Sequence, residues 1–206
     1  MPETAWRNGT ARIDGAPVSY REAGTGGAVL YLHSGDATPR ALDLIAAHRR
    51  VVALTLPESA TALGLRDTLA ALGIEHCDVL GAGKNATLAL RLKQAVPDQI
   101  GALVLLGPTL IAVGGAAADS ADQDLLGDIA ATAPCLALFG TRDEIVPVAA
   151  ARHYRERIPD CNLVFVYDTS QAMAEERPEA VASIVLDFLE RHNLFLVRRE
   201  SDLIFP

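Results

Sequence analysis

The stretch Val79-Leu80-Gly81-Ala82-Gly83-Lys84-Asn85-Ala86 joins an apolar run to a segment of helical character. The run, Cys77 to Gly81, has the length of a buried strand, and Lys84 to Ala95 has the pattern of a helix. The stretch therefore predicts a strand, a sharp turn and a helix in immediate succession.

The same alternation of strand-length and helical segments continues along the chain. It predicts an α/β fold with a mostly parallel sheet of the eight-stranded type and helices on both faces. Most of the strands are apolar at successive positions, as expected for strands buried on both faces. A hairpin, Ala11 to Glu22, is expected at the sheet edge. The other expected strands are Ala28 to His33, Val51 to Leu56, Cys77 to Gly81, Ala102 to Leu106, Cys135 to Phe139 and Leu163 to Tyr167. The expected helices are Pro39 to His48, Thr61 to Leu72, Lys84 to Ala95, Asp122 to Ala131, Val148 to Ile158 and Pro178 to His192.

A length of 206 residues, half of them hydrophobic, is enough for one well-cored domain. We expect residues 1–193 to form it. The Gly- and Ala-rich stretch Val113 to Ala121 is short and predicts a loop rather than a domain junction. Residues 194–206 mix apolar and charged side chains beyond the last expected helix, and we expect this tail to dock on the body or on a partner, as in a homo- or hetero-oligomer.

The formal net charge of −8 comes without basic runs and argues against nucleic acid and anionic membrane surfaces as partners. Cys77, Cys135 and Cys161 have no C-x-x-C spacing, so neither a disulfide framework nor a metal site is indicated. Met1 to Thr10 lacks the apolar core of a signal peptide, and glycine and proline interrupt Ala102 to Ala118. We expect a cytoplasmic protein without a membrane span, metal or cofactor.

Five segments, in order and spacing, resemble the α/β-hydrolase family, most closely its esterase and lactonase branch. Besides the turn at 79–86, these are Asp14 to Gly24, similar to the opening hairpin, and Leu30 to Gly35, similar to the loop that supplies an oxyanion donor. Gly140 to Pro147 resembles the acid loop, and Asp168 to Glu179 resembles the segment that carries the base. The resemblance implies the hydrolase fold. Because one short loop and one helix separate Leu106 from Pro134, it implies no cap domain.

Two of the three catalytic positions that the resemblance implies hold other residues. Gly83 stands at the nucleophile position and Gln171 at the base position, while the acid, Asp143, remains. Hydrolysis of this type needs a hydroxyl that attacks and a base with a pKa near 7. Loss of either costs roughly 10⁶ in turnover. Glycine adopts the strained backbone of such a turn without steric cost, so Gly83 is expected to keep the turn and not the chemistry.

Other side chains are weak replacements for the missing groups. The cysteines fall at strand starts, opposite the edge where ligands bind, and are expected to be buried small hydrophobes. His33 lies at a strand end, but a structural role is favoured. Ser34 and Ser170 lie near the expected pocket without an evident base, so local hydrogen bonds are the favoured interpretation.

The ligand-binding candidates around the turn are His33, Ser34, Gly35, Glu58 and Lys84. Lys84 could hold an anionic or carbonyl group together with backbone N–H groups, remain solvated, or pair with Glu58 and close the site. Asp143 could likewise serve only as a cap of its loop or of the following helix. Asn85 replaces the glycine that in the family allows close approach of helix and strand.

Three functions are compatible with these residues. The favoured one is a non-hydrolytic pseudoenzyme that binds a small molecule or a protein partner through the relict pocket. The second is an enzyme of altered mechanism, such as a lyase, isomerase or cyclase, that uses the relict oxyanion donors. The third is a weak hydrolase that acts on esters or lactones.

Overall fold

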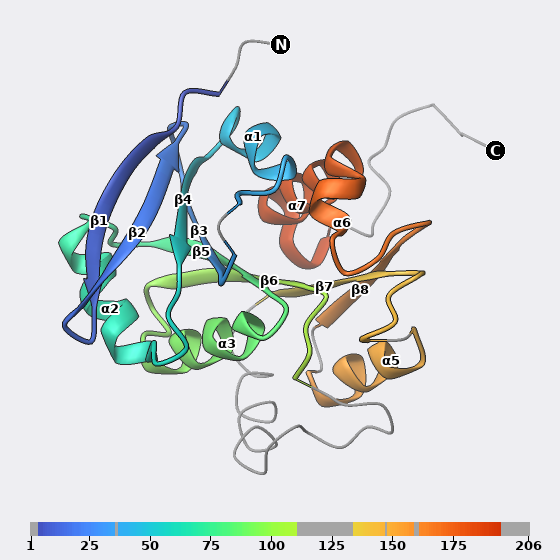
Figure 1. Ribbon diagram of the computed structural model, residues 1–206. Coiled ribbons are helices and arrows are strands. Elements are labelled where there is room, and N and C mark those ends of the chain that lie inside the picture. Colours follow the sequence, from blue (N-terminus) through green and yellow to red (C-terminus); the bar gives the residue numbers. More distant parts are fainter. Residues whose placement is uncertain (1–3, 36, 111–133, 147, 159–160, 195–206) are drawn as a thin grey trace.

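The computed structural model describes residues 4–35, 37–110, 134–146, 148–158 and 161–194. An eight-stranded sheet runs through the molecule in the order β1-β2-β4-β3-β5-β6-β7-β8 (Figure 1). The strands are β1 Arg7–Ile13, β2 Ala16–Ala23, β3 Ala28–His33, β4 Arg50–Thr55, β5 Cys77–Ala82, β6 Ile100–Leu106, β7 Cys135–Gly140 and β8 Cys161–Val166.

Strands β3 to β8 are parallel to one another, and only the hairpin adds antiparallel pairing. β1 pairs with β2, and β2 pairs antiparallel with β4. The predicted mostly parallel sheet with a hairpin at its edge is therefore confirmed.

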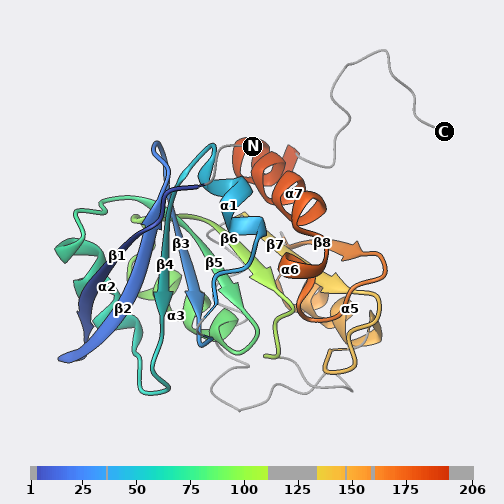
Figure 2. The ribbon, with the colours of Figure 1, turned by 45° about the horizontal axis from the view of Figure 1, so that its top comes forward.

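Helices cover both faces of this sheet, as predicted. α2, α3 and α5 lie on one face, and α1, α6 and α7 lie on the other (Figures 1 and 2). The helices are α1 Ala41–Ala46, α2 Ala62–Ala71, α3 Asn85–Ala95, α5 Val148–Arg157, α6 Met173–Glu176 and α7 Pro178–Arg191, followed by the 3₁₀ turn η1 His192–Leu194. None of the helices described is long and apolar enough to cross a membrane.

The core divides into two hydrophobic clusters, one on each face of the sheet. Alternate residues of the same strand serve the two clusters: in β3, Leu30 and Leu32 face α2 and α3, whereas Val29 and Tyr31 face α1 and α7. The central strands are apolar at most positions because both of their faces are covered.

Several predicted boundaries were wrong by a few residues. The hairpin begins earlier, at Arg7, because its first residues are exposed and carry no apolar alternation. α1 is only Ala41–Ala46, shorter than the predicted 39–48, and β8 runs from Cys161 to Val166 rather than from 163 to 167. α6, with four residues, is too short to show a period and was missed. The loop predicted at 113–121, the helix at 122–131 and tail residues 195–206 lie outside the described residues; the described parts of the chain form no cap domain.

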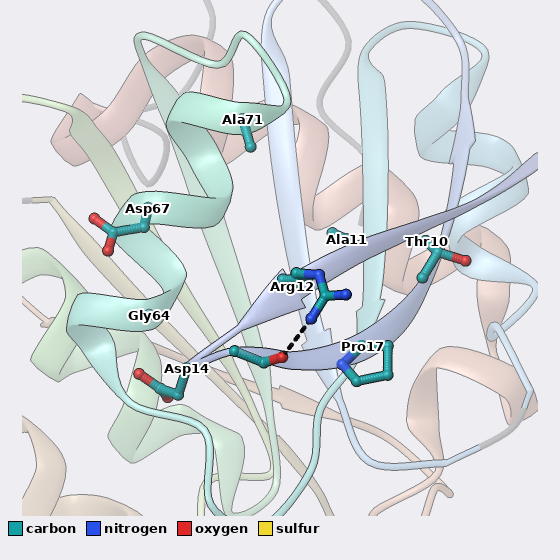
Figure 3. A pocket seen from close by; sticks show the side chains of 9 residues that line it. Thr10, Ala11, Arg12, Asp14, Pro17, Gly64, Asp67 and Ala71 are labelled. Atoms are coloured by element: carbon teal, nitrogen blue, oxygen red, sulfur yellow. Dashed lines mark hydrogen bonds between the residues drawn. The ribbon is translucent and has the colours of Figure 1, made fainter.

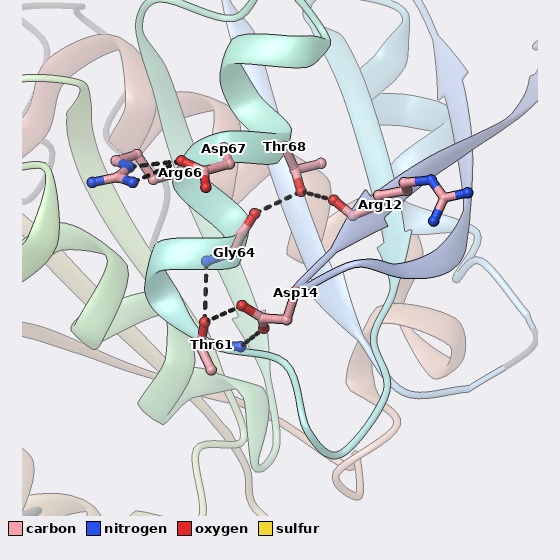
Figure 4. A network of polar contacts seen from close by, with 7 residues as sticks. All are labelled: Arg12, Asp14, Thr61, Gly64, Arg66, Asp67 and Thr68. Carbon is pink, nitrogen blue, oxygen red and sulfur yellow. Dashed lines mark hydrogen bonds and ion pairs between the residues drawn. The ribbon is translucent and has the colours of Figure 1, made fainter.

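A polar network fastens the hairpin to α2 (Figure 4). Asp14, with φ +51°, accepts hydrogen bonds from Thr61 N at 2.9 Å and from Thr61 Oγ1 at 2.8 Å. Thr61 Oγ1 caps α2 by accepting from Gly64 N at 3.0 Å, and Thr68 Oγ1 donates to Arg12 O at 2.8 Å. The turn of the hairpin therefore fixes where α2 begins.

The shallow groove beside this network has its charged groups occupied (Figure 3). Arg12 donates to Gly15 O at 2.8 Å, Asp14 is bonded to Thr61, and Asp67 is paired with Arg66. The groove is explained by the packing of the hairpin on α2.

Thr61→Val should lower the free energy of unfolding by about 1 kcal/mol, because it removes the helix cap and one bond to Asp14 without changing shape. Thr10→Val, the same change at an exposed position of β1 in the same groove, serves as the control and should have little effect. Urea unfolding of both variants measures the difference. Equal stabilities would show that the network does not hold α2.

Candidate functional site

The turn after β5 has the backbone of a nucleophile elbow without a nucleophile. Gly83 has φ +55°, a left-handed conformation that glycine adopts without strain. Close approach of strand and helix is carried by Gly81, where an added Cβ would lie 2.8 Å from Ala86 Cα. The approach is therefore kept although Asn85 replaces a glycine. The prediction that Gly83 preserves the turn is confirmed.

The positions expected to carry nucleophile and base face each other. A Cβ added to Gly83 would point toward Gln171 and lie 3.9 Å from its Nε2 atom. Gln171 Nε2 donates a hydrogen bond of 3.2 Å to Gly107 O, at the end of β6. The fold thus brings Gly83 and Gln171 together from segments 88 residues apart.

The third position, Asp143, is buried, with only 6% of its surface exposed. Its Oδ1 atom accepts hydrogen bonds from Ile145 N at 2.8 Å and Val146 N at 3.0 Å, so the predicted role as a loop cap is confirmed. Its Oδ2 atom is buried and has no hydrogen-bond partner within the described parts of the chain. A Cβ added to Gly107 would lie 3.6 Å from this oxygen and 2.9 Å from Gln171 Cγ, so Oδ2 is directed toward the space that Gln171 fills.

Hydrogen bonds between two loops hold Asp143 and Gln171 in place. Arg142 N donates to Thr169 O at 2.8 Å, and Asp168 N donates to Thr141 Oγ1 at 2.9 Å. Arg142 also pairs its guanidinium with the Asp168 carboxylate at 3.1 Å. The acid loop and the base loop therefore form one unit at the carboxyl ends of β7 and β8.

A cavity of about 490 Å³ opens between these loops, within the size range of small-molecule sites. Its wall is largely acidic, with one guanidinium that is already paired to Asp168. The lining residues are Arg142, Asp143, Glu144, Ile145, Ser170, Gln171 and Glu176.

Ser170 and Glu176 are bound to each other at the rim of this cavity. Glu176 accepts from Ser170 Oγ at 2.6 Å and from Ser170 N at 2.7 Å. These bonds lower the pKa of Glu176 below its usual value, which makes its carboxylate a weak base. The predicted local role of Ser170 is confirmed. The contact of Glu176 with Ser170 was not predicted from the sequence, because it depends on the turn between the two residues and not on helical spacing.

On the other side of Gly83, Lys84 donates to Glu58 at 2.8 Å. The hydrogen bond and the positive charge of Lys84 lower the pKa of Glu58. This is the ion pair expected as the alternative to ligand binding by Lys84; both side chains remain exposed, and they line a smaller cavity of about 240 Å³. Such a pair contributes little stability.

The remaining candidates are placed as follows. Ser34 lies in the same small cavity and accepts a 3.0 Å hydrogen bond from Asn85 Nδ2, and Gly35 is exposed beside it. His33 is buried and stacks on Tyr31, with ring centroids 5.0 Å apart. This packing agrees with the structural role favoured from the sequence, and ligand binding by His33 stays an untested prediction.

The three cysteines begin β5, β7 and β8, as predicted, and all are buried. Burial raises the pKa of Cys77 to about 12. A hydrogen bond with Cys161, together with burial, raises the pKa of Cys135. Neither thiol ionises near neutral pH, and both lie at the edge of the sheet opposite Gly83. Among the described residues, no group of His, Cys, Asp and Glu side chains is arranged to hold a metal ion.

Comparison with known proteins supports the fold by structure alone. No family model and no curated protein matches the sequence. Among solved structures, a predicted CIB-like hydrolase from Thermoplasma acidophilum has a TM-score of 0.73 at 20% identity, covering 90% of this chain and 98% of that one. A serine hydrolase from Cycloclasticus zankles has a TM-score of 0.75 at 16% identity, covering 90% and 98%. Carboxylesterase CesB from Bacillus subtilis has a TM-score of 0.73 at 13% identity, covering 90% and 92%.

The strand order, the elbow and these neighbours agree, and the chain has the α/β-hydrolase fold. At such identities the likeness establishes the fold and not the reaction.

Thiol reactivity offers a direct check on the buried cysteines. At pH 8 a disulfide reagent such as DTNB should label none of the three in the folded protein, because each is buried and a protonated thiol is a poor nucleophile. Protein unfolded in guanidinium provides the reference with all three labelled. Rapid labelling of the folded chain would show that one of these thiols is accessible and reactive.

Proposed function

We propose that this chain is a non-hydrolytic protein of the α/β-hydrolase fold that binds a small molecule through the cavity lined by Asp143 and Gln171, next to Gly83. The observation that carries the proposal is the pairing of an intact elbow with two vacated positions. Gly83 keeps φ +55°, yet its missing side chain would face an amide, Gln171 Nε2, at 3.9 Å. The site has kept its shape and lost both reacting groups.

An amide cannot take the proton of a hydroxyl at neutral pH, so Gln171 cannot replace a histidine base. Two hydroxyls near the site already make local hydrogen bonds: Ser34 with Asn85, and Ser170 with the weakly basic carboxylate of Glu176. His33 is buried against Tyr31. These contacts support binding rather than hydrolysis.

The cavity supports a small ligand over a protein partner. About 490 Å³ between the acid loop and the base loop suits a small molecule, and its wall includes a buried carboxylate rather than a broad apolar surface. A protein partner of the tail at 194–206, and an altered enzyme that uses the relict oxyanion donors, remain the alternative proposals.

The wild-type protein should be inert toward serine-hydrolase reagents. A fluorophosphonate probe should give no covalent adduct by mass spectrometry, and p-nitrophenyl acetate should be hydrolysed no faster than by buffer, because Gly83 and Gln171 supply neither a hydroxyl nor a base at this site. Stoichiometric labelling or saturable turnover would overturn the proposal in favour of a weak hydrolase of esters or lactones.

Gly83→Ser together with Gln171→His should create probe labelling and raise ester hydrolysis by about 100-fold, since a hydroxyl then faces a base. The new imidazole would find Asp143 Oδ2, which now lacks a partner. Serine at φ +55° costs about 1–3 kcal/mol of stability, so the melting temperature is measured alongside.

Gly83→Ser alone is the matched control and should stay inert, because it carries the same strain without a base. Labelling of this single variant at the rate of the double one would show that another residue acts as the base.

A further inference from the structure

We propose that the ligand of the pocket between the acid and base loops is a small organic cation with N–H donors, such as a primary alkylammonium or amidinium, bound through Asp143. This inference rests on the proposed function and names the chemical class of its ligand. It assigns Asp143 to recognition of the ligand instead of orientation of a base.

The first support is the unpartnered oxygen. Asp143 is 6% exposed, its Oδ1 atom is saturated by two backbone N–H groups, and its Oδ2 atom has no partner. Buried carboxylate oxygens in native proteins are almost always hydrogen-bonded, so an orphaned one needs a donor. A carboxylate oxygen accepts and cannot donate, so the missing partner carries N–H or O–H groups.

The charge of the cavity selects a cation. Asp143, Glu144 and Glu176 line it, and the one guanidinium, that of Arg142, is bound to the Asp168 carboxylate at 3.1 Å. The lowered pKa of Glu176 keeps its carboxylate ionised at neutral pH. An anionic ligand would meet these charges without a free counter-charge in the lining, whereas an ammonium group is attracted to them.

Access to Oδ2 depends on Gln171. Its side chain is half-buried, lies over the position of a Gly107 Cβ, and is held by a hydrogen bond of 3.2 Å to Gly107 O. When this side chain turns away, Oδ2 is uncovered and Gly107 O loses the Gln171 donor, so both oxygens can accept hydrogen bonds. An ammonium group has three donors, which is enough for both.

The remaining wall fits the rest of such a ligand. Ile145, 62% exposed, lines the same cavity and offers an apolar surface next to the carboxylates. A short alkyl chain can lie on it while the cationic end reaches inward. Lys84, on the other side of Gly83, is paired with Glu58 and does not line this cavity.

Three probes of equal size and different charge test the class of ligand: n-butylammonium, n-butanol and n-butyrate. In ¹H–¹⁵N NMR titrations, butylammonium should give saturable shifts at the amides of Gly107, Ile145 and Gln171, and butyrate should give none. Asp143→Asn should weaken butylammonium binding by about tenfold or more, since it removes a charged acceptor. Asp67→Asn, at an exposed carboxylate outside the cavity, is the matched control and should leave binding unchanged.

Gln171→Gly is a second variant, which tests the inference without changing Asp143. It uncovers Oδ2 and should strengthen butylammonium binding, and melting curves confirm that each variant is folded. Unchanged affinity in both Asp143→Asn and Gln171→Gly would overturn the inference.

The outcomes also separate this inference from the proposed function. Saturable binding of butyrate or butanol at the same amides, without binding of butylammonium, would overturn the cationic class and leave a ligand-binding pocket in place. Absence of saturable shifts with every probe, in wild type and in Gln171→Gly, would overturn the inference and count against a small-molecule site altogether.

Discussion

The close contact of β5 with α3 is the steric constraint on which the rest of the molecule depends. β5 is a central strand, paired with β3 on one side and β6 on the other, and α3 begins three residues after it ends. A single methyl group at Gly81 would collide with the backbone of Ala86. Because the helix can lie this close, the chain reverses tightly at Gly83 and the elbow stands at the top of the sheet.

Four successive strand ends then supply the four parts of the site. Gly83 follows β5, Gly107 follows β6, Asp143 follows β7 and Gln171 follows β8. Parallel strands carry their carboxyl ends to one edge, which is where open α/β sheets bind ligands. The two loops that carry Asp143 and Gln171 are joined by a hydrogen bond from Arg142 N to Thr169 O and by one from Asp168 N to the Thr141 hydroxyl, so main chain and one side chain together set their separation.

Sequence patterns predicted the architecture and a good part of the site. The central strands and α7 were found because their apolar residues alternate or recur with the period of the element, and the positions Gly83, Asp143 and Gln171 were found through the resemblance to the hydrolase family. The Lys84–Glu58 pair was expected as one alternative because Glu58 lies just past the end of the preceding parallel strand. Strand ends and the four-residue α6 were not predicted, since exposed hairpin residues and one helical turn carry no periodic signal.

The unpartnered oxygen of Asp143 could not be foreseen from sequence. It depends on how closely Gly107 approaches Gln171, a matter of tertiary packing that involves four loops at once. The resemblance to hydrolases identified Asp143 and Gln171, but only the coordinates show that the amide turns to Gly107 O and leaves the carboxylate half satisfied.

The turn at Gly83 also bears on how such a chain could change over generations. The two missing residues are unequal as evolutionary steps. Serine at position 83 would place a side chain in a left-handed backbone and lower stability before any base existed to use it. Histidine at position 171 would give the buried oxygen of Asp143 the partner that it lacks. A lineage that acquired hydrolysis would therefore meet the smaller barrier by acquiring the base first and the nucleophile second.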